Sequence, residues 1–143
     1  MVSATELRES EFLKGFTEPE LAALASVASH SRWAEGETLF REGSLAGYLY
    51  ILKSGTILLH FPNGRSLPLR GGGHAIGWSS LVSPFKYTAT AVCLTDADLY
   101  EFRGRDLYRL IQMDADFGKH LMRKISGIME ERRAYRSMQT QAV

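Results

Sequence analysis

The stretch Gly71–Val92, GGGHAIGWSSLVSPFKYTATAV, is the one around which the rest of the chain is organised. It starts with a glycine run, continues through a short polar turn (Trp78–Ser80) and a proline loop (Ser83–Phe85), and ends in an alternating segment typical of a β-strand. A glycine turn frees backbone N–H groups, and such groups can receive an anion where a helix starts. The stretch therefore predicts a pocket for a small ligand.

The composition is that of a globular protein with nearly balanced charge. With 143 residues, 45% of them hydrophobic and 23% charged, the chain is expected to form a single domain, residues 1–143. Seventeen basic residues against sixteen acidic ones give a net charge of +1, which excludes a uniformly basic, nucleic-acid-binding surface. No apolar run approaches the roughly 18 residues of a membrane span, and the N-terminus lacks the pattern of a signal peptide. Cys93 is the sole cysteine and is expected to be buried and inert. We therefore expect a cytoplasmic protein with no membrane contact.

The middle of the chain, from His30 to Phe102, is divided by glycines into short segments of β-type sequence. Segments of this length and spacing predict a small antiparallel sandwich or barrel. Asn63-Gly64 is typical of a hairpin turn, and Pro62 and Pro68 place that hairpin near a sheet edge. The predicted strands are Ser31–Ala34, Thr38–Arg41, Tyr48–Lys53, Thr56–Phe61, Ser66–Arg70, Tyr87–Leu94 and Leu99–Arg103.

Helical sequence lies on both sides of this region, which predicts the α+β class. Residues 1–8 are expected to be a loose lead-in, and 11–13 a single helical turn. Thr17 followed by Glu18-Pro19-Glu20 is a typical helix start, and this helix is expected to end near His30. After the β region, a helix over 105–113 is followed by a second one, capped by Asp114 or Asp116.

The last helix, which is expected to run toward residue 136, has an apolar side and a basic side. Its apolar stripe repeats near every 3.5 residues and consists of Phe117, Leu121, Ile125 and Ile128. Cations near a helix C-terminus suit the helix dipole, so the basic side is interpreted as a solvated face rather than a nucleic-acid-binding strip. The basic residues are Lys119, Arg123, Lys124, Arg132, Arg133 and Arg136.

The order and spacing of several motifs resemble the cyclic-nucleotide-binding domain family, the effector domains of catabolite-activator and Fnr-type regulators and of cyclic-nucleotide-regulated kinases. EGETLFREG at Glu35–Gly43 is similar to the family's glycine-flanked turn, and YLYILKSG at Tyr48–Gly55 to its strand and turn. FLKGFT at Phe12–Thr17 resembles the leading helices, and residues 77–92 fall where the family has its phosphate-binding cassette. The resemblance covers about residues 10–135.

This resemblance implies a double-stranded β-helix jelly roll with short N-terminal helices and a long C-terminal helix. The β-roll would span about residues 30–103 and the C-terminal helices about 104–136. The resemblance also implies a homodimer seam along the last helix, through its apolar stripe. Regulators of the family carry a helix-turn-helix domain after this helix. The seven residues after Arg136 are too few for one, so we expect no DNA-binding domain in this chain.

The cassette departs from the family pattern at two positions. In the family, a glutamate after the cassette glycine binds the ribose hydroxyl, and an arginine before Ser/Thr-Ala pairs with the phosphate. Gly77 and Thr88-Ala89 match this pattern, but Trp78 stands at the glutamate position and Tyr87 at the arginine position. An arginine–phosphate pair is worth on the order of 2–3 kcal/mol. Cyclic-nucleotide binding is therefore expected to be weaker by roughly a hundredfold or more.

What remains is a ligand site without a fixed cation. Trp78 and Tyr87 could contact a ligand or act as core aromatics with backbone partners, and the two serines could cap the short helix or donate to a ligand. Lys86 would need a β-bulge to turn inward, and His74 lies alone near the mouth of the cassette. The candidate ligand-binding residues are Gly77, Trp78, Ser79, Ser80, Tyr87, Thr88 and Ala89, with His74 and Lys86 as further candidates.

Three functions are open from the sequence. The first is a non-catalytic module for ligand sensing and signal transduction, which binds a cyclic nucleotide or another small anionic ligand and transmits a shift to the last helix. The second is a degenerate domain with a plugged pocket that serves as a dimerisation or protein-interaction scaffold. The third, a jelly-roll metalloenzyme, is disfavoured because the histidines lack His-x-His spacing, so no catalysis and no metal are expected. The histidines are His30, His60, His74 and His120.

Overall fold

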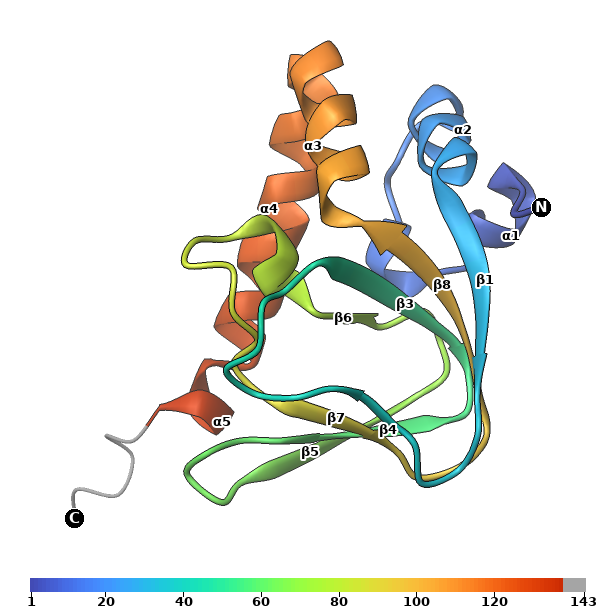
Figure 1. Cartoon of the computed structure of the whole chain (residues 1–143). Helices are drawn as coiled ribbons and strands as arrows, with labels where there is room; N and C mark the ends of the chain where they lie inside the picture. Colours follow the sequence, from blue (N-terminus) through green and yellow to red (C-terminus); the bar gives the residue numbers. More distant parts are fainter. Residues whose placement is uncertain (138–143) are drawn as a thin grey trace.

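The computed structural model describes residues 1–137 and contains two four-stranded antiparallel sheets with helices packed over one of them (Figure 1). The strand orders are β1-β8-β3-β6 and β2-β7-β4-β5. This arrangement confirms the predicted α+β jelly roll. The strands are β1 (Ala28–Trp33), β2 (Thr38–Phe40), β3 (Tyr48–Ser54), β4 (Thr56–His60), β5 (Ser66–Arg70), β6 (Ala75–Ile76), β7 (Thr90–Cys93) and β8 (Ala97–Arg103).

The helices lie at the two ends of the chain, except for one short turn in the cassette. They are α1 (Ala4–Arg8), η1 (Glu11–Leu13), α2 (Glu18–Ser26), η2 (Trp78–Leu81), α3 (Gly104–Met113), α4 (Ala115–Glu131) and α5 (Arg133–Arg136). The predicted start of α2 is confirmed: the Thr17 hydroxyl accepts from the Glu20 N–H and the Glu20 carboxylate from the Thr17 N–H. Asp114, one of the two predicted caps, accepts from the first N–H groups of α4.

Besides small shifts at strand ends, the unpredicted strand β6 and the division of the last helix into α4 and α5, three boundaries differ from the predictions. Residues 1–8 are not a loose lead-in, because Ser3 and Glu6 form a capping box that starts α1 and Leu7 is buried. Helix α2 ends at Ser26 rather than near His30, since β1 begins at Ala28 and pairs with all six positions of β8 from Ala97 to Phe102. The predicted strand from Tyr87 begins only at Thr90, which leaves Tyr87 in the cassette loop.

Strand β3 separates two hydrophobic cores, since successive side chains of a strand point to opposite faces. Leu49 and Ile51 belong to the core under the helices, whereas Tyr50 and Leu52 belong to the core between the sheets. Cys93 is buried in the second core, as predicted, and burial raises the pKa of its thiol. The cassette helix η2 lies where these two cores meet, with Trp78 and Leu81 in the first.

The apolar stripe of α4 packs inside this chain. Its four predicted seam residues are at most 8% exposed and belong to the core under the helices: Phe117, Leu121, Ile125 and Ile128. The hydrophobic spacing of the stripe is explained by its packing on the chain's own β-roll, so in this structure these side chains are not exposed to a second copy. A homodimer stays a prediction, and its seam would need other residues.

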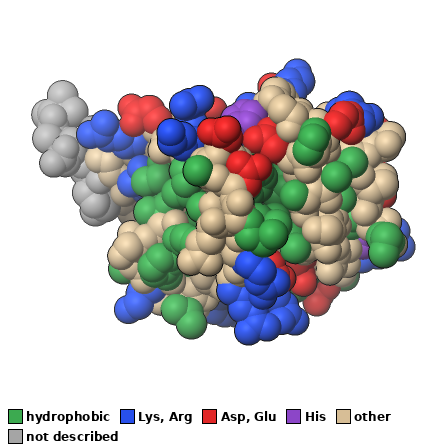
Figure 2. Space-filling model, turned by 90° about the horizontal axis from the view of Figure 1, so that it is seen from above, with side chains coloured by type: hydrophobic (Ala, Val, Ile, Leu, Met, Phe, Trp, Pro, Cys, Tyr) green, Lys and Arg blue, Asp and Glu red, His purple; other side chains and the backbone are tan. Residues whose placement is uncertain are grey.

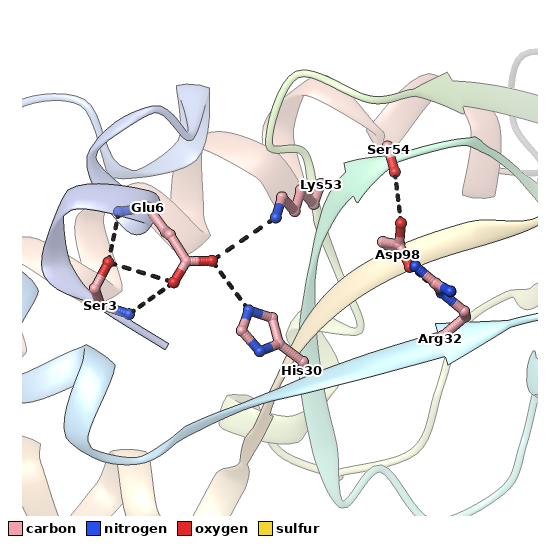
Figure 3. Close-up of polar contacts among 7 residues, drawn as sticks. All are labelled: Ser3, Glu6, His30, Arg32, Lys53, Ser54 and Asp98. Carbon is pink, nitrogen blue, oxygen red and sulfur yellow. Dashed lines mark hydrogen bonds and ion pairs between the residues drawn. The ribbon is translucent and has the colours of Figure 1, made fainter. Parts of the chain in front are cut away.

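The N-terminal helix is held to the sheet by exposed polar contacts (Figure 3). The Glu6 carboxylate lies 3.0 Å from His30 Nε2 on β1 and 3.7 Å from Lys53 Nζ on β3. Arg32 on β1 donates to Asp98 on β8 at 2.8 Å, and Asp98 also accepts from the Ser54 hydroxyl at 3.2 Å. Each of these charges has an opposite partner at the surface.

The β4–β5 hairpin has the predicted turn and also reaches the end of the chain's helical part. Gly64 has φ +89°, a conformation that favours glycine, and β5 forms the sheet edge as expected. The Asn63 amide donates to the Tyr135 carbonyl at 2.8 Å, and Arg65 donates to the Ala134 carbonyl. The hairpin therefore fixes α5 against the second sheet.

The surface seen from above carries hydrophobic side chains in several separate places, with charges of both signs mixed along its upper edge and a group of Lys and Arg at its lower edge (Figure 2). This face shows no continuous strip of one sign across it. Within residues 1–137, no helix is long and apolar enough to cross a membrane.

Candidate functional site

The cassette is positioned by a glycine that no other residue could replace without strain. Gly77 follows β6 and has φ +89°, in the left-handed region. A Cβ atom at this position would lie 2.8 Å from the Tyr48 carbonyl oxygen. The chain can therefore turn directly from β6 into η2, and all four η2 residues, Trp78–Leu81, are buried.

Tyr87 stands where the family has its phosphate-binding arginine, and it acts as a core aromatic. Its ring stacks on Phe40, with centroids 3.7 Å apart and an interplanar angle of 11°. Its hydroxyl donates to the Tyr48 carbonyl oxygen at 2.9 Å and accepts from the Tyr48 N–H at 3.1 Å. Burial raises the pKa of Tyr87, so the phenol stays neutral. Because the Tyr87 hydroxyl is hydrogen-bonded to the backbone of β3, this hydroxyl is not available to a ligand in this arrangement.

Trp78 and the two serines have different surroundings. The guanidinium carbon of Arg136 lies 5.4 Å from the Trp78 ring centroid, within range of a cation–π contact. The Ser80 hydroxyl donates to the Gly77 carbonyl at 2.9 Å, which is a bond within the turn and not a cap, since no side chain caps the start of η2. Ser79 is only 3% exposed, and among residues 1–137 its hydroxyl makes no hydrogen bond.

The cassette encloses a cavity with room for about one water molecule. Its volume is about 20 Å³, against the 10–15 Å³ or so that a single water requires. The residues that line it are Phe40, Leu59, Phe61, Gly77, Trp78, Ser79, Tyr87, Thr88, Ala89 and Arg132. A nucleotide does not fit this volume, so any ligand of that size would have to open the cavity first.

Arg132 is the charged group of this cavity, and sequence reasoning missed it. It is 6% exposed, and within the described part of the chain its guanidinium makes no hydrogen bond or ion pair. Burial lowers its pKa to about 10, partly offset by the nearby charge of Glu131, so it remains a cation at neutral pH. The signal was present in the sequence: one further helical turn carries the stripe from Ile128 to Arg132.

A second cavity, of about 240 Å³, lies on the other side of this arginine. Six of its lining residues are ionisable: Glu11, His74, Arg123, Lys124, Glu131 and Arg132. His74, a further candidate for the cassette, faces this second cavity and not the first. Arg132 lines both cavities.

Six of the seven main candidates therefore surround one cavity: Gly77, Trp78, Ser79, Tyr87, Thr88 and Ala89. Ser80 does not line it. Lys86 is exposed and lies at an isolated bridge to Leu45, so no bulge turns it inward.

The resemblance to a known family extends well beyond the cassette. The model of the cyclic nucleotide-binding domain matches residues 30–114, more than half of the chain.

The chain belongs to the cyclic nucleotide-binding domain family. Domains of this family are generally regulatory rather than catalytic. The cyclic nucleotide-binding domain described here also superimposes on solved structures of that fold. One is a cyclic nucleotide-binding protein from Geobacter metallireducens, with 24% identity, a TM-score of 0.83, and coverage of 92% of this chain and 98% of the other. Another is the N-terminal domain of a transcriptional regulator from Streptomyces coelicolor, with 28% identity, a TM-score of 0.69, and coverage of 92% and 97%.

A curated relative of the domain is much longer than this chain. Glutaminase 1 of Bradyrhizobium diazoefficiens is 26% identical over 130 residues, which make up 90% of this chain but only 21% of the relative. The chain thus spans about a fifth of that protein's length. Among the described residues, no group of three His, Cys, Asp or Glu side chains could hold a metal ion.

Proposed function

We propose that this domain is a non-catalytic regulatory module that binds a small ligand at the cassette and couples binding to the position of the α4–α5 segment. It would act in the cytoplasm. The observation that carries the proposal is the composition of the cavity wall, where the cassette residues Ser79 and Thr88 share one cavity with Arg132 of the last helix. A ligand larger than water must move some part of this wall.

The coupling follows from the contacts of the helix end. Arg136, one turn after Arg132, packs over the ring of Trp78 and donates to the Met129 carbonyl at 3.1 Å. A ligand that enters beside Trp78 disturbs both arginine contacts. If the ligand binds more tightly when the helix end is displaced, it shifts the helix toward that position. Cassette occupancy is then converted into a change at the end of α4.

Calorimetry with cyclic AMP, cyclic GMP and a panel of anionic metabolites tests the binding half of the proposal. Hydrogen exchange of the amides of residues 129–137, with and without the ligand found, tests the coupling half. We expect faster exchange in this segment when ligand is bound. Absence of binding across the whole panel, or binding that leaves these amides unchanged, would count against the module.

The second candidate, a plugged scaffold domain, is favoured by the small cavity and by the Tyr87–Tyr48 hydrogen bonds. Two substitutions restore the family residues: Trp78→Glu and Tyr87→Arg together. If the double variant binds a cyclic nucleotide and the unmodified chain binds no ligand of the panel, the result would support loss of an ancestral site. A scaffold would also have to form a homodimer or bind another protein. Sedimentation velocity of the purified chain shows whether it forms a homodimer.

A further inference from the structure

A buried cation without a partner is the least usual feature of this molecule. Arg132 is only 6% exposed, and no carboxylate among residues 1–137 forms an ion pair with it. Its neighbour Arg133 takes Glu130, at 3.8 Å, on the exposed side of the helix. Transfer of an ionised group from water into an apolar site is costly unless an opposite charge goes with it. The site thus favours entry of an anion.

The surroundings of Arg132 would hold an oxyanion rather than a halide or a neutral molecule. A guanidinium presents several N–H donors in a planar fork, which matches two oxygens of a carboxylate or phosphate. Ser79, a residue that is 3% exposed, lines the same cavity, and its hydroxyl is a second donor that makes no hydrogen bond within the described residues. The aromatic rings of Phe40, Trp78 and Tyr87 line the same cavity and leave room for about one water molecule, and a charge–charge interaction is stronger in such a poorly hydrated site.

We propose that Arg132 is the oxyanion-binding residue of this domain and that, from the last helix, it supplies the cation that the cassette lacks at Tyr87. The ligand group is a carboxylate or phosphate of a small molecule, and Ser79 contributes a hydroxyl donor. This inference rests on the proposed function, since it names the chemistry of the same site. It also moves the charge from the cassette loop to the C-terminal cap of α4.

The second cavity gives the oxyanion a route. At about 240 Å³ it is roughly twelve times larger than the cassette cavity, and Arg132 lines both. Arg123 and Lys124 add positive charge at its wall, while Glu11 is already engaged by Lys14 at 2.8 Å. An anion drawn in by these two cations would therefore meet Arg132 before it reaches the cassette.

Relocation of the cation explains why a ligand would act on the helix at all. An arginine at Tyr87 in the cassette loop would bind phosphate without involving α4, whereas an oxyanion on Arg132 bonds directly to the end of the element that must respond. Binding and displacement then share one interaction, and the differential affinity that a switch requires arises at Arg132.

The test uses Trp78 as a reporter. The chain has two tryptophans, so Trp33→Phe leaves Trp78, which lines the cavity, as the only one. In this background, inorganic phosphate, succinate and cyclic AMP are titrated separately while indole fluorescence and melting temperature are recorded. The three probes separate free phosphate, carboxylate and nucleotide as sources of the oxyanion. Arg132→Gln is compared with Arg133→Gln, which removes the same charge from the exposed face of the helix.

We expect saturable binding of at least one probe, weakened about 10- to 100-fold by Arg132→Gln and by less than about threefold by Arg133→Gln. Arg132→Lys should give an intermediate affinity, because it keeps the charge and loses the fork. Circular dichroism confirms that each variant is folded, and Arg132→Gln should melt no lower than the parent.

Two results overturn the inference. The first is equal affinity of the Arg132→Gln and Arg133→Gln variants for a probe that the parent binds, which would leave the sensing module in place with another binding residue. The second is no binding of any of the three probes by the parent. The metabolite panel described under the proposed function then decides separately whether the module itself stands, since neutral ligands in that panel do not require Arg132.

Discussion

The two ends of the helical layer handle charge in opposite ways. At the N-terminal end, the charged groups are exposed and paired, as with Glu6 beside His30 and Arg32 beside Asp98. At the C-terminal end, Arg132 is buried without a partner, and the Arg136 Nε atom is buried without a hydrogen bond within the described residues. Exposed pairs add little to stability, whereas buried unpaired cations subtract from it. The first end is suited to holding the fold together, and the second to binding something.

The largest expected effect comes from removal of the buried charge. Arg132→Met keeps an unbranched side chain but removes the charged guanidinium, and it should stabilise the ligand-free protein by roughly 3 kcal/mol, since each pKa unit corresponds to about 1.4 kcal/mol and burial lowers this pKa to about 10 from 12.5. The free energy of unfolding, from urea titration, measures the effect. Arg32→Met at the opposite end is the matched control and should change stability far less, because its ion pair with Asp98 is exposed to solvent.

The pH dependence of this effect has a defined sign. The folded-state pKa of Arg132 is depressed, so the cost of its charge is fully present below about pH 10 and disappears as pH rises from there toward 12.5. The gain from Arg132→Met should therefore be constant between pH 6 and 8. A gain that changed across this range would mean that another titrating group is responsible.

The next effect concerns the residue that fills the arginine position of the cassette. Tyr87→Phe removes the hydroxyl that bridges the N–H and carbonyl of Tyr48, and leaves both backbone groups without that partner. We expect a loss of about 1–3 kcal/mol in the free energy of unfolding, with the ring stacked on Phe40 unchanged. An effect near zero would show that Tyr87 is not held by these bonds and is available to a ligand.

A smaller, opposite effect is expected within α4. Gly127 lies inside the helix, and a Cβ atom there would meet nothing within 4 Å. Gly127→Ala should therefore raise the free energy of unfolding by about 0.5–1 kcal/mol. If α4 bends at Gly127 when ligand binds, the same substitution should also weaken the ligand's effect on hydrogen exchange of residues 129–137. Stabilisation without that second change would place the bend elsewhere.

The smallest effect is expected at the N-terminal end. The hydrogen bond from His30 and the Ser3 N–H lower the pKa of Glu6 to about 2 from 4.5. A depressed carboxyl pKa contributes stability above about pH 4.5, and that contribution is lost as pH falls toward 2. Glu6→Gln should lower the melting temperature slightly at pH 7, and the difference should vanish in acid. A difference that persists at pH 2 would assign it to helix capping at Ser3.

Local signals explain which parts of the structure could be predicted. The α2 cap at Thr17 and the turn at Asn63-Gly64 depend on residues within a few positions of each other, and both are confirmed. Helix α1 was missed although Ser3 and Glu6 carry the same signal as Thr17 and Glu20. A helix of five residues is marginal by itself, and α1 is stable because Leu7 packs into the core.

The cassette shows where sequence reasoning fails. The sequence alone shows that Trp78 and Tyr87 replace the family's glutamate and arginine. It does not show what Tyr87 contacts, because its hydrogen-bond partner Tyr48 is 39 residues away. Arg132 was assigned to a solvated face, since basic residues near a helix end usually are exposed. Its position one turn after Ile128 continues the apolar stripe, but a charged residue is seldom buried, so the spacing alone did not indicate that Arg132 packs against the β-roll.

The contacts between the β4–β5 hairpin and α5 also determine how the molecule would bear a mechanical load. Asn63 and Arg65 donate to the Tyr135 and Ala134 carbonyls, so a pull on the C-terminal side of α5 is transmitted to this hairpin. Strand β5 lies at the sheet edge and is bonded only to β4, in the antiparallel register Thr56–Arg70 through His60–Ser66. The two side-chain bonds lie in series with the load and are fewer than the five paired positions of the ladder. Under tension, α5 should therefore detach from the hairpin before the β4–β5 ladder opens.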